Sequence, residues 1–207
     1  QNLKDGTKED AIQYFNQEFG VNFTNEKKTL LIIGGSLGAG IINQSIISHL
    51  HELAKSDVQV IWQTGKNYFA NCKKALATYH LPIVNSSIIC TAFISQMPLA
   101  YALADLVISR AGASSISELC LLGKPSILVP SPNVAEDHQT HNAMALVRKG
   151  AAILVKDVDA KEKMVETALS LIQDDERLGI LHENILTLAL PDSAKRIAEE
   201  VIALAKK

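Results

Sequence analysis

The sequence predicts an α/β fold, a Rossmann-like, doubly wound parallel sheet of six strands with helices on both faces. Three observations carry this prediction. Short apolar runs alternate with helical patterns along the whole chain, as in consecutive βαβ units. The runs are continuously apolar, which is typical of strands buried on both faces. A glycine-rich turn, Gly34–Gly40, follows the first of these runs and opens a helix.

The composition indicates a chain with a large core and excludes several classes of protein. With 207 residues, of which 47% are hydrophobic, we expect residues 1–28 to form a linker and a first helix, and 29–207 one domain. A net charge of −2 gives no support for a nucleic-acid partner. No apolar run approaches the ~20 residues of a membrane helix, and no signal peptide is visible. The three scattered cysteines favour free thiols in a reducing compartment. Because the chain lacks an initiator Met, we expect a fragment of a longer protein.

The six predicted strands share short runs rich in Val, Ile and Leu, at residues 29–33, 58–62, 88–91, 106–109, 126–129 and 151–155. The expected strand order is 3-2-1-4-5-6, with a crevice between strands one and four. Since the carboxyl ends of parallel strands meet at one edge, this order places the Gly34–Gly40 turn beside the turn at residues 110–115.

Helices fill the intervals, and polar residues indicate where they begin. Thr7 and Asp10 form a variant capping box for a helix that reaches about Phe19. Further helices are expected at 41–54, at 66–78 with a stop at 80–82, from Ser95 to Ala104, and after Ser114 and Ser115. Asp137, Asp159, Asp174 and Asp192-Ser193 then introduce the remaining helices.

The Gly34–Gly40 turn has the pattern of a phosphate-binding site, because backbone N–H groups and the positive helix end would face a ligand. It is not the dinucleotide fingerprint, since no G-x-G-x-x-G is present and strand two ends in Gln63 and Thr64 without an acidic residue. It is not a Walker A loop, because Ile41 stands where lysine should follow. A tight turn without a ligand is the simpler alternative.

The same turn also matches the G-x-S-x-G pattern of a hydrolase nucleophile elbow, with Ser36 as the nucleophile. The further members of a triad are formally available as Asp105, Asp137, His138 and His182. Such an elbow normally follows a strand with several strands before it, whereas this turn follows the first strand of the chain. Hydrolysis is therefore the weaker interpretation.

The turn after strand four offers a second anion site. Ser114 and Ser115 at a helix start provide hydroxyl and N–H groups, and Arg110 could offset phosphate charge. Glu118, about one turn further, could accept two hydrogen bonds from a ribose diol. The alternatives are a carboxylate that caps its own helix, and a surface ion pair for Arg110.

A third group of polar residues crowds the helix that begins near Asp137. The amides of Gln139 and Asn142 suit neutral sugar hydroxyls, because an amide both donates and accepts hydrogen bonds. His138 and His141 have i, i+3 spacing, but no third ligand with suitable spacing follows, so no metal is expected. Two anion sites, a diol-binding carboxylate and sugar-facing amides on one crevice together suggest a sugar nucleotide.

Several motifs resemble, in order and spacing, the bacterial peptidoglycan glycosyltransferases that add N-acetylglucosamine (GlcNAc) to lipid I to give lipid II. They are Gly34-Gly-Ser-Leu-Gly-Ala39, Ser109-Arg-Ala-Gly112, Ser117-Glu118, Gly123-Lys-Pro125, Val129-Pro130 and His138-Gln139-x-x-Asn142-Ala143. The resemblance covers only the C-terminal, donor-binding half of that two-domain GT-B family. Leu37 and His138 depart from it, since the family commonly has glutamine at both positions.

The resemblance implies a site for UDP-GlcNAc, with no cofactor. The diphosphate would be held by Gly35, Ser36, Ala113, Ser114 and Ser115, assisted by Arg110. The backbone of Ile94 would pair with uracil, and Glu118 would hold the ribose. The sugar would lie at His138, Gln139 and Asn142. No catalytic residue is expected here, because the family's base and its sites for lipid I and the membrane belong to the absent N-terminal domain.

The resemblance also implies a location and a limit on activity. The whole protein would be peripheral, on the cytoplasmic side of the bacterial inner membrane, whereas this chain alone would bind UDP or UDP-GlcNAc weakly and transfer nothing. The C-terminal helix would pack on the absent domain. The alternatives are another GT-B enzyme, an epimerase-type UDP-sugar enzyme, or a non-catalytic nucleotide-binding domain.

Overall fold

A computed structural model describes residues 3, 6–79, 86–134 and 137–205, apart from the side chain of Ala194. Its centre is a six-stranded sheet in the order β3-β2-β1-β4-β5-β6, and every pairing between neighbours is parallel. The predicted class and strand order are thus confirmed. The strands are β1 Lys28–Ile33, β2 Val58–Gln63, β3 Ile88–Thr91, β4 Leu106–Ser109, β5 Ser126–Leu128 and β6 Ile153–Leu154.

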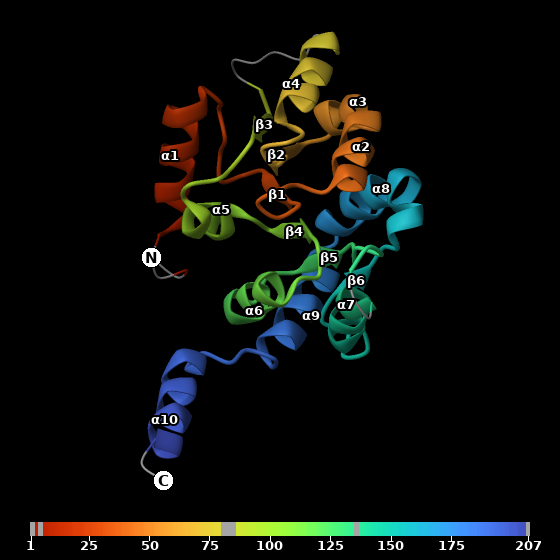
Figure 1. Cartoon of the computed structure of the whole chain (residues 1–207). Coiled ribbons are helices and arrows are strands. Elements are labelled where there is room, and N and C mark those ends of the chain that lie inside the picture. The colour runs from red at the N-terminus through yellow and green to blue at the C-terminus, as the bar shows by residue number, and fades with distance from the viewer. Residues whose placement is uncertain (1–2, 4–5, 80–85, 135–136, 206–207) are drawn as a thin grey trace.

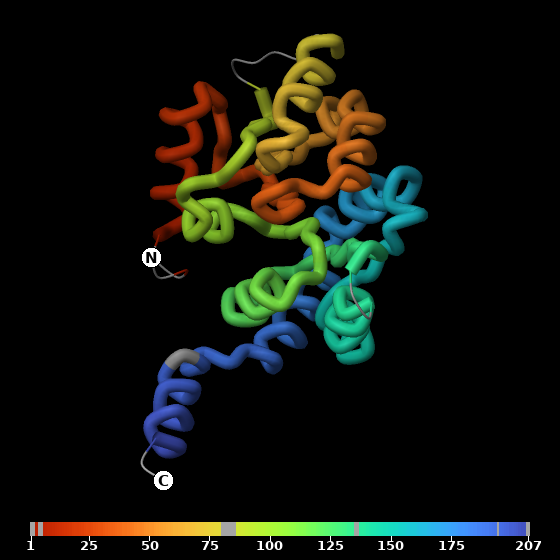
Figure 2. The backbone as a smooth tube through the Cα atoms, in the orientation of Figure 1, coloured from red at the N-terminus to blue at the C-terminus, as the bar shows by residue number. Residues whose placement is uncertain are grey.

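Helices cover both faces of the sheet (Figure 1). They are α1 Lys8–Phe19, α2 Gly40–Ser48, α3 Leu50–Lys55, α4 Phe69–Thr78, α5 Met97–Leu103, α6 Ala113–Leu122, α7 His138–Val147, α8 Ala160–Ile172, α9 Asp175–Leu186 and α10 Ser193–Ala205, with a 3-10 turn at Asp157–Asp159. The tube in Figure 2 follows the repeated passage from a strand to a helix and back. None of the helices within these described residues is long and apolar enough to cross a membrane.

The apolar runs are buried on both sides because successive strand residues face opposite layers. Leu30 and Ile32 of β1 pack in a core with α2, α3 and α8, whereas Leu31 and Ile33 pack in a second core with α1, α5 and α6. All four side chains are at most 6% exposed. The sheet is therefore buried between two helical layers, and the loops at the carboxyl ends of its strands can hold ligand-binding residues.

Several predicted helix starts are wrong in detail. The helix expected at 41–54 is two helices joined at His49, and the one expected at Lys66 begins at Phe69. Ser95 does not cap α5, because the N-cap of that helix is Gln96. The Ser95 hydroxyl instead lies 3.2 Å from the hydroxyl of Tyr14. The stop expected at 80–82 lies outside the described residues.

Other predicted caps divide according to whether the side chain can reach the helix. The capping box of Thr7 and Asp10 is confirmed, and the Asp174 carboxylate accepts a hydrogen bond from the Arg177 N–H. Asp159 precedes α8 but makes no such bond, because the 3-10 turn leaves its backbone in a helical conformation with ψ of −11°. A polar residue beside a helix start is thus not sufficient for a cap.

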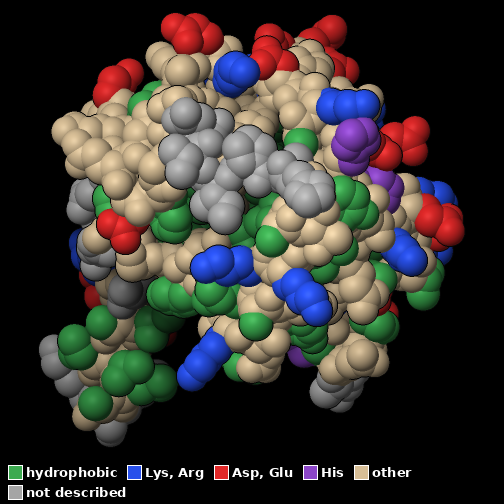
Figure 3. Space-filling model, turned by 90° about the horizontal axis from the view of Figure 1, so that it is seen from above, with side chains coloured by type: hydrophobic (Ala, Val, Ile, Leu, Met, Phe, Trp, Pro, Cys, Tyr) green, Lys and Arg blue, Asp and Glu red, His purple; other side chains and the backbone are tan. Residues whose placement is uncertain are grey.

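Helix α10 stands away from the sheet (Figure 1). Its large apolar residues Ile197, Val201, Ile202 and Leu204 are between 53% and 67% exposed. Apolar side chains gather on a lobe that projects from the body of the molecule in the space-filling view (Figure 3). Helix α10 therefore contributes little to the core.

Candidate functional site

The carboxyl ends of β1 and β4 lie side by side, at the point where the strand order changes direction. Leu30 to Ile33 of β1 pair with Leu106 to Ser109 of β4, so the residues after Ile33 and after Ser109 emerge together. This is the topological switch point of the sheet, where open α/β folds bind ligands. The strand order thus brings the two predicted turns to the same edge of the sheet.

The glycine turn after β1 takes a shape that needs glycine. Gly35 and Gly38 have φ values of +82° and +84°, and the Gly38 N–H donates to the Gly35 carbonyl at 3.1 Å. A Cβ on Gly38 would stand 2.1 Å from the carbonyl oxygen of Thr64. The turn therefore lies tightly against the end of β2, and Gly35 and Ser36 remain exposed at the edge of the sheet.

Helix α2, which follows this turn, begins without a side-chain cap. Its N-cap is Ala39, which offers no hydrogen-bonding side chain. The first N–H groups of any α-helix lack intrahelical partners, and here no capping side chain accepts from them; the positive end of the helix dipole lies at the same place. This arrangement can bind an anion such as a phosphate group.

Helix α6, at the end of β4, repeats the arrangement. The prediction that Ser114 and Ser115 cap it is wrong, because the N-cap is Gly112 and no side chain caps the helix. Ala113, Ser114 and Ser115 instead form its first turn, where Ala113 and Ser114 are exposed. The absence of a cap leaves the N–H groups of this turn available to a ligand. Two uncapped helix starts thus follow the carboxyl ends of two neighbouring strands.

Glu118 lies on α6, one turn beyond the predicted anion site, and is half-buried. Its Oε2 accepts a 2.9 Å hydrogen bond from the hydroxyl of Tyr101 on α5. Burial and the neighbouring Glu118 raise the pKa of Tyr101, so the phenol keeps its proton and acts as a donor. The contact fixes one carboxylate oxygen and leaves the other for a ligand.

Arg110 follows β4 directly, and its charge is already paired. Its Nη1 donates to the Val129 carbonyl at 3.0 Å and forms an ion pair with Asp157, which precedes α8. The side chains of Arg110 and Asp157 are only 16% and 22% exposed, so this pair is not the surface pair considered as an alternative. In this structure the pair joins the ends of β4 and β5 to the segment before α8.

The amides on α7 hold the neighbouring loops. Oε1 of Gln139 accepts from the Ser131 N–H at 2.9 Å, and Nδ2 of Asn142 donates to the Ala111 carbonyl at 3.1 Å. Nε2 of Gln139 and Oδ1 of Asn142 are not used by these contacts. Asn142 thereby connects α7 with the residues before α6, while His138 is exposed at the start of α7.

The position of Ile94 limits which of its backbone groups could make the predicted uracil contact. Ile94 is 3% exposed in the loop after β3, and its N–H donates at 2.9 Å to Oε1 of Gln63. The N–H is therefore occupied, so pairing with a uracil edge would use the Ile94 carbonyl. The site prediction missed Gln63, Tyr101 and Asp157. The one sequence signal among them was the place of Gln63 at a strand end, since the partners of all three residues depend on how distant segments pack.

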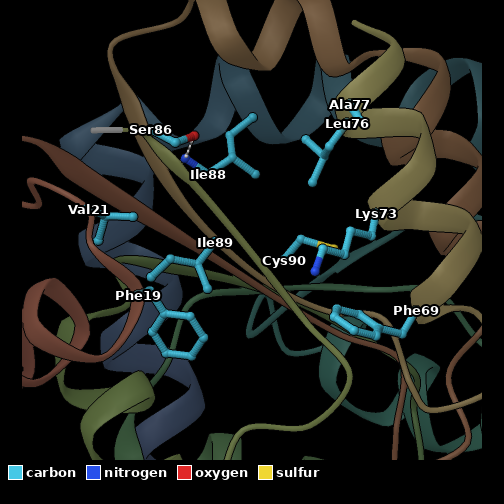
Figure 4. Close-up of a pocket in the computed structure, with 10 residues that line it drawn as sticks. All are labelled: Phe19, Val21, Phe69, Lys73, Leu76, Ala77, Ser86, Ile88, Ile89 and Cys90. Atoms are coloured by element: carbon cyan, nitrogen blue, oxygen red, sulfur yellow. Dashed lines mark hydrogen bonds between the residues drawn. The ribbon is translucent and has the colours of Figure 1, made fainter. Parts of the chain in front are cut away.

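A separate apolar cavity of about 170 Å³ opens beside the edge strand β3 (Figure 4). None of the predicted site residues lines it. Its walls come from the end of α1, from α4 and from β3, with Phe19, Phe69, Lys73 and Cys90 among them (Figure 4). Burial raises the pKa of Cys90 to about 12, so its thiol is unreactive at neutral pH. This cavity is distinct from the crevice at the switch point.

The fold and the two uncapped helix starts define an open α/β domain that can bind an anionic ligand at the switch point of its sheet. The chain belongs to glycosyltransferase family 28, whose C-terminal domain matches residues 29–197.

The chain is similar to curated relatives that are about twice as long. It is 54% identical over 201 residues, 97% of the chain but 52% of the relative, to the "UDP-N-acetylglucosamine--N-acetylmuramyl-(pentapeptide) pyrophosphoryl-undecaprenol N-acetylglucosamine transferase" of Parabacteroides distasonis. The corresponding protein of Bacteroides fragilis is 56% identical over 193 residues, 92% of the chain and 49% of the relative. The chain thus spans about half the length of these relatives.

Solved structures share the fold. The MurG crystal structure from Acinetobacter baumannii superposes with a TM-score of 0.76 at 24% identity, over 97% of this chain and 54% of that one. At that identity, the likeness establishes the fold alone.

Proposed function

We propose that this chain is the donor-binding half of an inverting glycosyltransferase that moves GlcNAc from UDP-GlcNAc to lipid I, giving lipid II for peptidoglycan. The observation that carries the proposal is the pair of uncapped helix starts, α2 and α6, which follow neighbouring strands, with Glu118 one turn further along α6. The relatives with over 50% identity, whose printed name describes this transfer, support it. An epimerase or another GT-B enzyme would share the fold but use a different reaction or sugar.

The proposed donor lies across the crevice from the end of β3 to the start of α7. The diphosphate accepts hydrogen bonds from Gly35 and Ser36 in the glycine turn before α2, and from the first turn of α6 at Ala113, Ser114 and Ser115. The free oxygen of Glu118 accepts from the ribose diol. Nε2 of Gln139 and Oδ1 of Asn142 hold GlcNAc hydroxyls, with His138 beside them. Arg110 acts chiefly by fixing the ends of β4 and β5 through Asp157.

In the proposed reaction, a lipid I hydroxyl attacks C1 of GlcNAc from the side opposite the diphosphate. The new C1–O bond forms as the bond from C1 to the β-phosphate oxygen breaks, and UDP leaves with that electron pair. The helix starts stabilise the negative charge that develops on the leaving diphosphate. The acceptor's proton passes to a base outside this chain, in an N-terminal domain that also binds lipid I.

The proposal extends to the assembly. The exposed apolar residues of α10 supply a face that could pack on the N-terminal domain. That domain would hold the protein peripherally on the cytoplasmic side of the inner membrane. Release of the two-domain protein from membranes by salt or carbonate, without detergent, is the expected result; a need for detergent would contradict peripheral attachment.

The transfer itself is tested with a lipid I analogue and UDP-GlcNAc. We expect the two-domain protein to form the disaccharide product and release UDP, and the 207-residue chain to form none. UDP-GalNAc serves as the competing donor, and free GlcNAc and 2-epimerised sugar are assayed in parallel. Turnover by the isolated chain, or epimerisation without transfer by the two-domain protein, would contradict the proposal.

A further inference from the structure

Gln63 occupies the carboxyl end of β2, between the ends of β1 and β3. It is 5% exposed, and its carboxamide makes two contacts. Nε2 donates to the Gly35 carbonyl in the glycine turn at 3.3 Å, and Oε1 accepts from the Ile94 N–H in the loop after β3 at 2.9 Å. One side chain therefore joins two loops that belong to different strands.

The two contacts fix the orientation of the amide. A carbonyl on one side requires the NH₂ group, and an N–H on the other requires the oxygen. Neither aspartate nor leucine could make both bonds, and a glutamate would lose the donor to Gly35. In dinucleotide-binding folds the end of this strand carries an acid that binds a ribose. Here the same place carries a neutral bridge between loops.

We propose that Gln63 is a positioning residue that sets the distance between the diphosphate-binding and uridine-binding parts of the site. This inference rests on the proposed function. Gln63 holds the Gly35 turn, which faces the diphosphate, and Ile94, whose backbone faces the uracil. The bridge makes the two parts one preorganised site, so UDP gains affinity from both ends at once.

The same strand supplies a matched control. Gln59 is also buried, at 1% exposed, and lies four residues earlier on the same face of β2. Its carboxamide binds the Thr24 N–H, the Thr24 carbonyl and the Thr29 hydroxyl, at the opposite end of the strand from the crevice. Replacing either glutamine with methionine keeps the side-chain length and removes the amide contacts.

The test is calorimetric titration of the two-domain protein with uridine, pyrophosphate and UDP. We expect Gln63→Met to raise the Kd for UDP about tenfold, because two polar groups lose their partner. Uridine and pyrophosphate each touch one loop, so each should lose less affinity than UDP. Gln59→Met should leave all three affinities unchanged, although it lowers the unfolding temperature.

The outcomes separate the role of Gln63 from the proposed function. Wild-type protein that binds none of the three ligands would overturn both. Binding by the wild type that Gln63→Met leaves unchanged would overturn the role of Gln63 alone. If Gln63→Met does not fold, Gln63→Glu replaces it, because glutamate keeps the acceptor for the Ile94 N–H. We expect this variant to retain its affinity for uridine and to bind UDP more weakly. Retention of both affinities would overturn the proposal.

Discussion

The hydroxyl of Tyr101 donates a 2.9 Å hydrogen bond to Oε2 of Glu118, and Tyr101 itself is 1% exposed. The tyrosine belongs to α5 and the glutamate to α6, so the contact joins the helix that precedes β4 in the chain to the helix that follows it. It holds the carboxylate that we propose for the ribose.

Tyr101→Phe tests whether this bond orients Glu118. The change removes one oxygen and preserves the ring in its buried place. Because a hydrogen bond to a charged group contributes roughly 1.5–3 kcal/mol, we expect UDP to bind about tenfold more weakly in the two-domain protein. Calorimetric titration measures this change. Tyr14→Phe is the control, since the Tyr14 hydroxyl lies 3.2 Å from that of Ser95 and makes no hydrogen bond to Glu118. Equal UDP affinity in both variants would show that Glu118 needs no support from Tyr101.

Gly38→Ala tests the close approach of the glycine turn to β2. The new Cβ would stand 2.1 Å from the Thr64 carbonyl oxygen at a φ of +84°, so the turn must move. We expect a loss of roughly 1–3 kcal/mol in the free energy of unfolding, and loss of UDP binding. Gly179→Ala is the control, because it lies within α9 with open space around it, and a gain of about 0.5–1 kcal/mol is expected there. Denaturant unfolding measures both values. A Gly38→Ala protein as stable as wild type would contradict the tight packing of the turn.

Asp157→Asn tests the ion pair with Arg110. The pair is mostly buried, so its loss leaves a guanidinium without its counter-charge, and we expect a cost of roughly 1–2 kcal/mol in stability. The comparison is Asp57→Asn, which breaks a pair with Lys27 in which the aspartate is 77% exposed; that change should cost almost nothing. Urea unfolding at low and high salt measures the difference. Similar small costs at both sites would mean that solvent screens the Arg110 pair.

Lys124 gives a prediction about pH. Burial lowers its pKa to about 8 from an ordinary value of 10.5, although its Nζ donates to the Ala104 carbonyl at 2.8 Å. Between about pH 8 and pH 10.5, Lys124 binds more protons in the unfolded chain than in the folded one. Its contribution to the free energy of unfolding therefore rises with pH in this range. Above pH 9, Cys72 and Cys90 act in the opposite direction, because burial raises their pKa values.

The difference between wild type and Lys124→Met isolates this contribution, because both proteins contain the same cysteines. We expect the variant to be the more stable at pH 7, and its advantage to shrink as the pH rises from 8 to 10.5. Unfolding free energies at several pH values measure it. An advantage that does not change with pH would show that Lys124 titrates normally in the folded protein.

The sheet could be predicted from the sequence because its signal is local. Runs such as Leu30 to Ile33 are apolar at every position, which is typical of strands buried on both faces. The strand order then placed the glycine turn after β1 beside the turn after β4. The helix starts were less predictable, since Ser95 and Ser114 could cap a helix but the backbone placed Gln96 and Gly112 there instead.

The contacts that support the site could not be predicted in the same way. Tyr101, Asp157 and Gln63 meet Glu118, Arg110 and Ile94 across 17 to 47 residues of sequence, and the partner depends on how the elements pack. Arg110 was expected to face phosphate, but the carboxylate of Asp157 reaches it. Residue type indicated which polar groups are present, and packing determined which of these groups are already bonded within the protein.

The most direct measurement is calorimetric titration of the 207-residue chain and the two-domain protein with UDP-GlcNAc, alongside UDP and UDP-GalNAc. Glu118→Ala tests the site, and Glu166→Ala, an exposed carboxylate on α8, is the control. We predict that the two-domain protein binds UDP-GlcNAc more tightly than UDP-GalNAc, that Glu118→Ala abolishes binding, and that Glu166→Ala does not. Binding that survives Glu118→Ala unchanged, or no binding of any uridine nucleotide by the two-domain protein, would contradict a UDP-sugar site in this crevice.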